Sequence, residues 1–193
     1  MSFISSIAIA TIRMAVPLIL LAIAELYSEK AGMVNIGLEG LAAIGALFGF
    51  MITYYTGNSW AGILCGAVAG VAVNMIYAYA TISLCANHIV YGMAVNIFAP
   101  ALASFLYRMS FGTGNSLTQI ALMNDFKVPG FSQIPILGKL LFQSTPMVYL
   151  TIFLVLFTYI YFAKTKSGLN YSAVGEFPKA AATIGINVIR IKY

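Results

Sequence analysis

The sequence predicts an all-α, polytopic integral membrane protein with about five transmembrane helices and a short cytoplasmic helix near residue 180. Of its 193 residues, 61% are hydrophobic and 8% are charged, whereas about 25% are charged in a typical soluble protein. The apolar residues gather in runs that approach the roughly 20 residues a helix needs to cross a bilayer. Aromatic residues make up 13% of the chain, as belts at membrane–water interfaces require.

Five apolar runs are expected to be the membrane spans, and a polar stretch separates the last two. The runs cover residues 4–27, 38–55, 60–84, 89–107 and 147–163. The stretch 108–145 mixes Gly, Asn, Ser, Gln and Pro too irregularly for a lipid-exposed span, so it is predicted to be an external loop. The chain turns polar again over residues 164–193.

The distribution of basic residues predicts how the chain is inserted. If residues 164–193 are cytoplasmic, that side of the membrane holds six cations and the other side holds three: Lys30, Lys164, Lys166, Lys179, Arg190 and Lys192 against Arg108, Lys127 and Lys139. Since cytoplasmic loops carry the excess of Lys and Arg, an external N-terminus and a cytoplasmic C-terminal segment are expected.

Small residues within the spans predict where helices approach one another. Gly62, Gly66 and Gly70 recur at every fourth position of the third run, and Gly45 and Gly49 share a face of the second. Such faces let helix backbones pack closely in lipid. Cys65 and Cys85 would be about 30 Å apart on one continuous helix, so both are expected to be unpaired core residues.

Signatures of catalysis, metal binding and nucleic-acid binding are missing from the sequence. His88 is the single histidine and has no carboxylate near it in sequence, and neither a Walker A motif nor a GxGxxG motif occurs. The net charge of +5 is scattered rather than gathered in a basic stripe. We therefore expect no catalytic residues, no metal, no cofactor and no nucleic-acid partner.

The stretch VNIGLEG, residues 34–40, places polar and helix-loosening residues between two apolar runs. Glu39 opens a helix, where the helix dipole favours a carboxylate by about 0.3–1 kcal/mol. Alternatively, Asn35, Gly37 and Gly40 break the helix at depth, which is tolerated where the backbone is buried in protein or lines a water-filled path. Both interpretations, structural support and a solute pathway, stay open.

A second polar cluster is ANHIVYGMAVN, residues 86–96. Asn87, Tyr91 and the region of Val95 recur at helical spacing and should share one face. Together with Asn96 they offer neutral donors, neutral acceptors and an aromatic ring, which suit a neutral polar solute. The alternative is that these side chains hydrogen-bond one helix to another.

The C-terminal segment predicts a short helix exposed on the basic side of the membrane. Pro178 is a favourable first helical residue, Gly185 can end the helix in the left-handed conformation, and Glu176 lies near its positive end. A short helix between two polar turns is suited to docking on a soluble partner.

Four stretches in order resemble one family. SGLNYSAVGEFPKAAATIGINVIRIKY resembles the coupling segment of bacterial ABC importer permeases of the branched-chain amino acid and simple sugar group. VNIGLEGLAAIGA resembles the segment near their substrate path. With ANHIVYGMAVN and PGFSQIPILGKLLF, the chain is most similar to permeases of nucleoside importers that are served by receptors of the basic membrane protein type.

The resemblance implies a function and a set of partners. Two permease subunits, as a homo- or heterodimer, would form a pathway in the bacterial cell membrane for nucleosides or simple sugars, and an external substrate-binding lipoprotein would deliver the solute. A cytoplasmic ATP-binding subunit would receive the coupling helix, about 178–184. The expected coupling residues are Gly175, Glu176, Phe177, Pro178, Ala181 and Gly185, and the expected pathway residues are Asn35, Glu39, Asn87, Tyr91 and Asn96.

Two departures from the family pattern stand out. Phe177 replaces the Asn common in the family, so the helix start lacks a capping side chain worth about 1 kcal/mol. Family members also continue beyond the coupling segment with further membrane helices, so the chain is expected to be the N-terminal part of a permease. An ATPase-independent secondary transporter or channel is the main alternative, and a membrane enzyme or assembly factor is the second.

Overall fold

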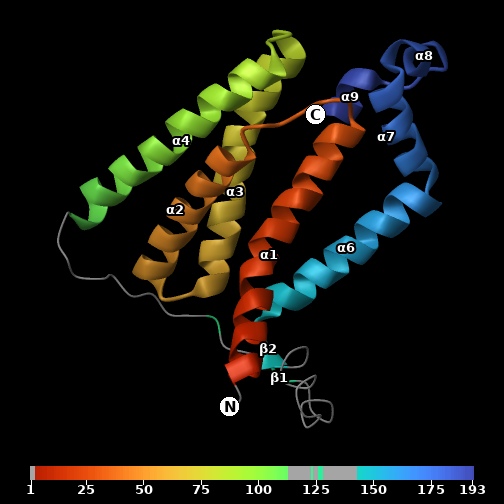
Figure 1. Cartoon of the computed structure of the whole chain (residues 1–193). Coiled ribbons are helices and arrows are strands. Elements are labelled where there is room, and N and C mark those ends of the chain that lie inside the picture. Colours follow the sequence, from red (N-terminus) through yellow and green to blue (C-terminus); the bar gives the residue numbers. More distant parts are fainter. Residues whose placement is uncertain (1–2, 113–122, 124–125, 128–142) are drawn as a thin grey trace. The chain divides into compact units, whose positions relative to one another are not determined.

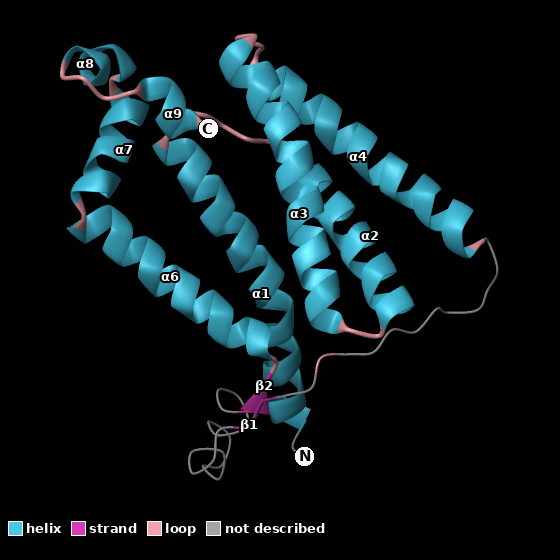
Figure 2. Cartoon of the chain, turned by 180° about the vertical axis from the view of Figure 1, so that it is seen from behind, coloured by secondary structure: helices cyan, strands magenta, loops and turns pink. Residues whose placement is uncertain are grey.

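The computed structural model describes residues 3–112, 123, 126–127 and 143–193. Across these residues the chain is almost wholly helical, and Figure 2 shows helices joined by short connections, with one small strand pair. Within this described part of the chain, five helices are long and apolar enough to cross a membrane. The prediction of an all-α polytopic membrane protein is therefore confirmed.

The chain divides into two compact units, Met1–Leu26 with Met123–Leu169, and Tyr27–Leu122 with Asn170–Tyr193. The first unit contains most of α1 (Phe3–Lys30), the strands β1 (Phe126–Lys127) and β2 (Gln143–Ser144), and α6 (Pro146–Lys164). The two strands pair antiparallel, with Phe126 opposite Ser144, a pairing that the sequence did not lead us to expect. Most of the predicted external loop, 108–145, lies outside the described residues.

The second unit is built on three helices that lie side by side in Figure 1: α2 (Leu38–Thr56), α3 (Ser59–Ala78) and α4 (His88–Phe111). Their shared core contains the buried side chains Ile44, Leu47, Ala99 and Ala103. Most other apolar side chains on these helices are exposed, and no more than 28% of any candidate span is buried. A surface this apolar is stable against lipid or other membrane helices, and not against water.

Glycines set the contact between α2 and α3. A Cβ atom placed on Gly66 would lie 2.6 Å from the carbonyl oxygen of Gly45, and one placed on Gly62 would lie 2.6 Å from that of Gly49. The expected small-residue contact is confirmed for these four glycines, because any larger residue would separate the backbones. Gly70 does not belong to it, since a Cβ there would meet nothing within 4 Å.

The third span ends differently from the continuous helix that the sequence predicted. After Ala78 the helix widens into a π-helical turn, η1 (Tyr79–Ser83), and the Leu84 amide donates to the carbonyl of Tyr79 at 3.2 Å. The chain then leaves the helix through Cys85, whose φ is 52°. Cys85 is exposed, so its expected place in the core was wrong. The π-turn shortens the helix and puts Cys85 in the connection that follows.

Three short helices make up the C-terminal segment: α7 (Lys166–Glu176), α8 (Pro178–Thr183) and α9 (Val188–Lys192). The predicted short helix is α8, and Gly185 follows it with the expected left-handed φ of 86°. The expectation of a polar turn before it was wrong, because α7 occupies that position. Its sequence KSGLNYSAVGE contains two glycines and is mostly polar, so the helix depends on packing rather than on local propensity.

Candidate functional site

The stretch VNIGLEG forms part of a helix break inside the second unit. Between α1 and α2 the backbone leaves the helical conformation, and Gly32 takes a φ of 76°. Asn35 is 5% exposed, and its side-chain oxygen accepts a hydrogen bond from the Gly37 amide at 3.1 Å. Its amide nitrogen donates to Asn74 on α3 across a longer 3.5 Å. Asn35 therefore satisfies the irregular backbone and ties it to a neighbouring helix.

The start of α2 is capped by a residue from another helix. Gly37, at the N-cap position, has no side chain with which to cap. Instead, Asn96 of α4 accepts from the Gly40 amide at 2.7 Å and donates to the Glu39 carboxylate at 3.2 Å. A Cβ on Gly40 would lie 2.7 Å from the Val95 carbonyl oxygen. The two helices therefore meet at van der Waals distance, and a side chain of α4 does for α2 what an N-cap side chain does for its own helix.

Tyr77 makes a second connection at the same end of the unit. Its side chain is 4% exposed, and its hydroxyl lies 3.1 Å from the Val34 carbonyl oxygen and 3.3 Å from that of His88. Its ring packs against Tyr91 with the centroids 5.7 Å apart. One side chain on α3 thus holds both the helix break and the start of α4.

The structure brings the five expected pathway residues to one end of the α2–α3–α4 bundle, and four of them, Asn35, Glu39, Tyr91 and Asn96, take part in the contacts above. Asn87 lies outside the helix, and its side chain caps α4 by accepting from the Ile89 and Val90 amides at 3.0 and 3.3 Å. The prediction that Asn87 presents its side chain on the face of Tyr91 was therefore wrong. A capping asparagine must turn its side chain back toward the first amides of its helix.

Two residues of this network were missed by sequence reasoning. Asn74 and Tyr77 lie in the apolar run of α3 and contact the break through the hydrogen bonds above. A polar amide in the middle of an apolar span is costly unless it finds a partner, so Asn74 carried a usable signal. Tyr77 carried none, because tyrosine is common in this chain and at membrane interfaces.

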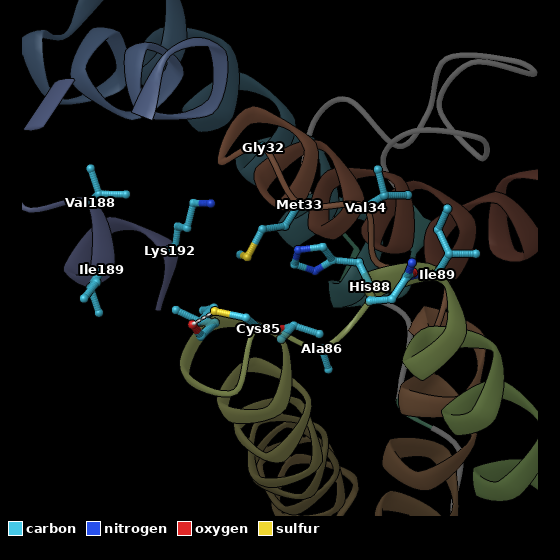
Figure 3. Close-up of a pocket in the computed structure, with 13 residues that line it drawn as sticks. Gly32, Met33, Val34, Cys85, Ala86, His88, Ile89, Val188, Ile189 and Lys192 are labelled. Carbon is cyan, nitrogen blue, oxygen red and sulfur yellow. Dashed lines mark hydrogen bonds between the residues drawn. The ribbon is translucent and has the colours of Figure 1, made fainter. Parts of the chain in front are cut away.

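A cavity of about 750 Å³ opens beside this network. It is lined by the connection 32–34, the end of η1, the start of α4, and α9. Figure 3 shows His88 and Lys192 directed into the space between these elements, with Cys85 on one wall. The Nδ1 atom of His88 is buried and has no hydrogen-bond partner among the described residues.

The expected coupling residues divide into exposed and packed positions. Phe177 is 71% exposed and, as expected, makes no capping hydrogen bond at the start of α8. Glu176 is exposed as well. Ala181, by contrast, is 3% exposed, and Gly175 lies against the backbone of Lys30 and Gly32. Ala181 and Gly175 are therefore packing positions, and Gly175 packs against the connection that follows α1.

The chemistry of the network is that of neutral hydrogen bonding. Amide and hydroxyl groups of Asn35, Asn74, Asn96 and Tyr77 offer donors and acceptors, with the Glu39 carboxylate at the exposed edge. Within the described residues, no three His, Cys, Asp or Glu side chains gather in a way that could hold a metal ion. The arrangement can support a helix break or contact a neutral polar solute.

Residues 7–193 match the family model described as "Branched-chain amino acid transport system / permease component". The chain belongs to this permease family. Its relatives include a nucleoside ABC transporter permease of Lactococcus lactis, 38% identical over 92% of this chain. A guanosine ABC transporter permease of Bacillus subtilis is 36% identical over 95%. A putative glucose ABC transporter permease of Haloferax volcanii is 34% identical over 100%.

This permease-family chain spans between 58% and 60% of the length of those three relatives. No match was found among solved structures. Family membership and five apolar helices together make the chain a multi-pass membrane protein. All three relatives are named as permease proteins of ABC transporters.

Proposed function

We propose that this chain forms part of the transmembrane subunit of an ATP-driven importer for nucleosides, with simple sugars as the next class. A separate ATP-binding subunit would dock on the C-terminal segment, a second permease subunit would complete the pathway, and an external lipoprotein would deliver the solute. The relatives named for nucleoside and guanosine transport support this solute class. The bacterial cell membrane, with the N-terminus outside, is the proposed location.

The observation that carries the proposal is the exposed apolar surface around α8. Phe177 and Ile184 flank this helix and are 71% and 74% exposed, although they belong to a segment rich in polar residues. Exposed apolar side chains on a short, well-terminated helix are typical of a surface that a groove in a partner protein covers. The groove would belong to the ATP-binding subunit.

Association of the purified permease with its ATP-binding subunit tests this surface. Pro178→Gly should loosen the first turn of α8, Glu176→Lys should reverse a charge beside it, and Phe177→Ala should remove an apolar anchor. Each is expected to weaken association by about tenfold, since anchor residues at interfaces are worth about 1–2 kcal/mol. Ile189→Ala, at a residue 64% exposed on α9, is the matched control. Unchanged association in all three variants would contradict the proposal.

The proposed insertion can be measured separately. In a variant whose free cysteines Cys65 and Cys85 are both replaced by serine, Lys179→Cys should not react with a membrane-impermeant maleimide in sealed cells. It should react once the cells are permeabilised. Ready labelling in sealed cells would show that α8 is external, and ATPase docking on α8 would then be impossible.

The polar network is proposed to line the solute path on one side. Asn35, Glu39, Tyr91 and Asn96 offer a ring and hydrogen-bonding groups that suit a nucleoside, with Asn87 at the adjoining cavity. Uptake of radiolabelled guanosine should fall on depletion of ATP. Uptake that survives ATP depletion but disappears with the ion gradient would favour the ATPase-independent transporter.

A further inference from the structure

A backbone-to-backbone contact joins the end of α7 to the start of the helix break. A Cβ atom on Gly175 would collide with the carbonyl oxygen of Lys30 and lie 3.0 Å from the amide nitrogen of Gly32. In the other direction, a Cβ on Gly32 would lie 2.8 Å from the carbonyl oxygen of Gly175. Any side chain at either position would force the backbones apart, because neither contact atom can move independently of its chain.

Side chains around this contact keep it closed. Val174 and Ala31, the immediate neighbours of the two glycines, are 0% exposed. Tyr171, one turn earlier on α7, donates its hydroxyl to the Tyr27 carbonyl oxygen at 3.1 Å. The two rings also meet edge to face, with their centroids 6.0 Å apart. Gly32 is exposed on its other side and Gly175 is half-buried, but between them the backbones are closely packed, and closely packed groups transmit displacement.

The position of the contact in the chain connects two regions that have separate proposed roles. Gly175 is three residues before α8, and Gly32 is three residues before Asn35. From there the break is tied to α3 and α4, because Tyr77 reaches both the Val34 and the His88 carbonyl oxygens. The shortest path of contacts from α8 to the polar network therefore runs through α7 and residues 31–34.

We infer that the Gly32–Gly175 contact is the joint through which movement of α8 reaches the polar network. This inference rests on the proposed function, and it gives Gly175 a positioning role instead of a direct contact with the ATP-binding subunit. Gly32 ends α1 with a φ of 76°, a conformation that glycine adopts freely, and the Met33 amide closes this turn on the Ser28 carbonyl oxygen at 3.0 Å, so the surface that faces Gly175 is held in place.

The two possible roles of Gly175, a joint or a docking contact, predict different effects of its substitution. If Gly175 only contacted the ATP-binding subunit, its substitution would weaken association and uptake together. If it is a joint, Gly175→Ala should leave association and ATP hydrolysis within about twofold while uptake per ATP hydrolysed falls by about tenfold, the usual size of a coupling between two sites. Gly70→Ala is the matched control, because a Cβ there meets nothing within 4 Å.

The test uses the complete transporter in proteoliposomes, with radiolabelled guanosine as the probe and ATP hydrolysis measured in the same vesicles. Tyr171→Phe is the milder variant, since it removes the hydrogen bond to Tyr27 and keeps the ring contact. It should lower uptake per ATP by about threefold, which corresponds to one hydrogen bond. It also keeps the test decisive if Gly175→Ala does not fold.

Three outcomes are distinguishable. A selective loss of uptake per ATP in the Gly175 or Tyr171 variants, with Gly70→Ala unchanged, supports the joint. An unchanged ratio in a folded Gly175→Ala transporter, or a ratio that is kept while association is lost, overturns it. Wild-type vesicles that take up guanosine without ATP overturn the proposed function itself, and this result is visible before any variant is examined.

Discussion

Two close backbone contacts in the same unit are built on different principles. At the α2–α3 interface, Gly45 and Gly49 meet Gly66 and Gly62 between two regular helices. At the other contact, Gly32 meets Gly175 where one partner is the end of a helix and the other is irregular backbone. The first contact has a hydrogen bond for nearly every backbone group within its own helices. At the second contact the amides of Ala31, Gly32 and Met33 still donate to carbonyls of α1, and partners from side chains are needed from Val34 onward.

The difference explains why polar residues gather at one end of the bundle. A regular helix satisfies its own amides and carbonyls, so small residues are sufficient for two helices to approach. The broken segment leaves backbone groups that need partners, and side chains supply them: Asn35 for the Gly37 amide, Asn96 for the Gly40 amide and Tyr77 for the Val34 carbonyl. The stability of the α2–α3 contact is therefore expected to depend on the volume of the side chains in it. The stability of the helix break is expected to depend on its side-chain hydrogen bonds.

The largest expected effect is on the α2–α3 face. Gly62→Leu should destabilise the permease by about 3 kcal/mol or more, because even its Cβ would collide with Thr53 and the Gly49 carbonyl oxygen. Unfolding of the purified protein in mixed micelles measures the change. Gly70→Leu is the control and should lie within about 0.5 kcal/mol of the wild type. Equal losses of stability in both variants would show that the close α2–α3 contact is not the cause.

The next largest effect is expected where Asn96 caps the start of α2. Asn96→Ala should cost about 2 kcal/mol, because the Gly40 amide loses its acceptor at a tightly packed position. Asn96→Asp keeps that acceptor but places a second carboxylate beside Glu39. The stability lost in Asn96→Asp should be recovered in the double variant with Glu39→Gln. If the double variant is no more stable than Asn96→Asp, the interaction between residues 39 and 96 is not energetically significant.

Tyr77→Phe should have a smaller effect, about 1 kcal/mol. The substitution removes the hydroxyl contacts to Val34 and His88 and leaves the ring packed against Tyr91. Tyr79→Phe, at an exposed residue two positions away, is a suitable control. Hydrogen exchange of the amides in residues 31–37 should rise in the Tyr77 variant and not in the control. Unchanged exchange there would break the link between Tyr77 and the helix break.

The smallest stability effect is expected at α8. Phe177→Ala should change the free energy of unfolding by less than about 0.5 kcal/mol, since the side chain is 71% exposed and makes no cap. The same variant is expected to weaken association with the ATP-binding subunit. A large loss of stability would mean that Phe177 packs within the permease, and it would remove Phe177 from the proposed docking surface.

Much of this protein could be predicted from its sequence because the bilayer imposes simple requirements. Apolar runs of membrane length must be helices, glycines at every fourth position let helices approach, and a proline and a glycine bound α8. Asn35, Glu39, Tyr91 and Asn96 were identifiable as polar residues in apolar surroundings. The roles of these four residues were not, since a polar side chain in a membrane span serves equally well as a helix contact or a solute contact.

The tertiary structure decided which residues meet and what each side chain does there. It turned Asn87 into a helix cap, buried the side chain of Ala181 on one face of α8 and added Asn74 and Tyr77 to the network. It also paired Gly32 with Gly175, which are 143 positions apart in the sequence. Local composition fixes the secondary structure because backbone hydrogen bonds in a helix are local. Contacts between distant residues depend on how the helices pack, and that information is spread over the whole chain.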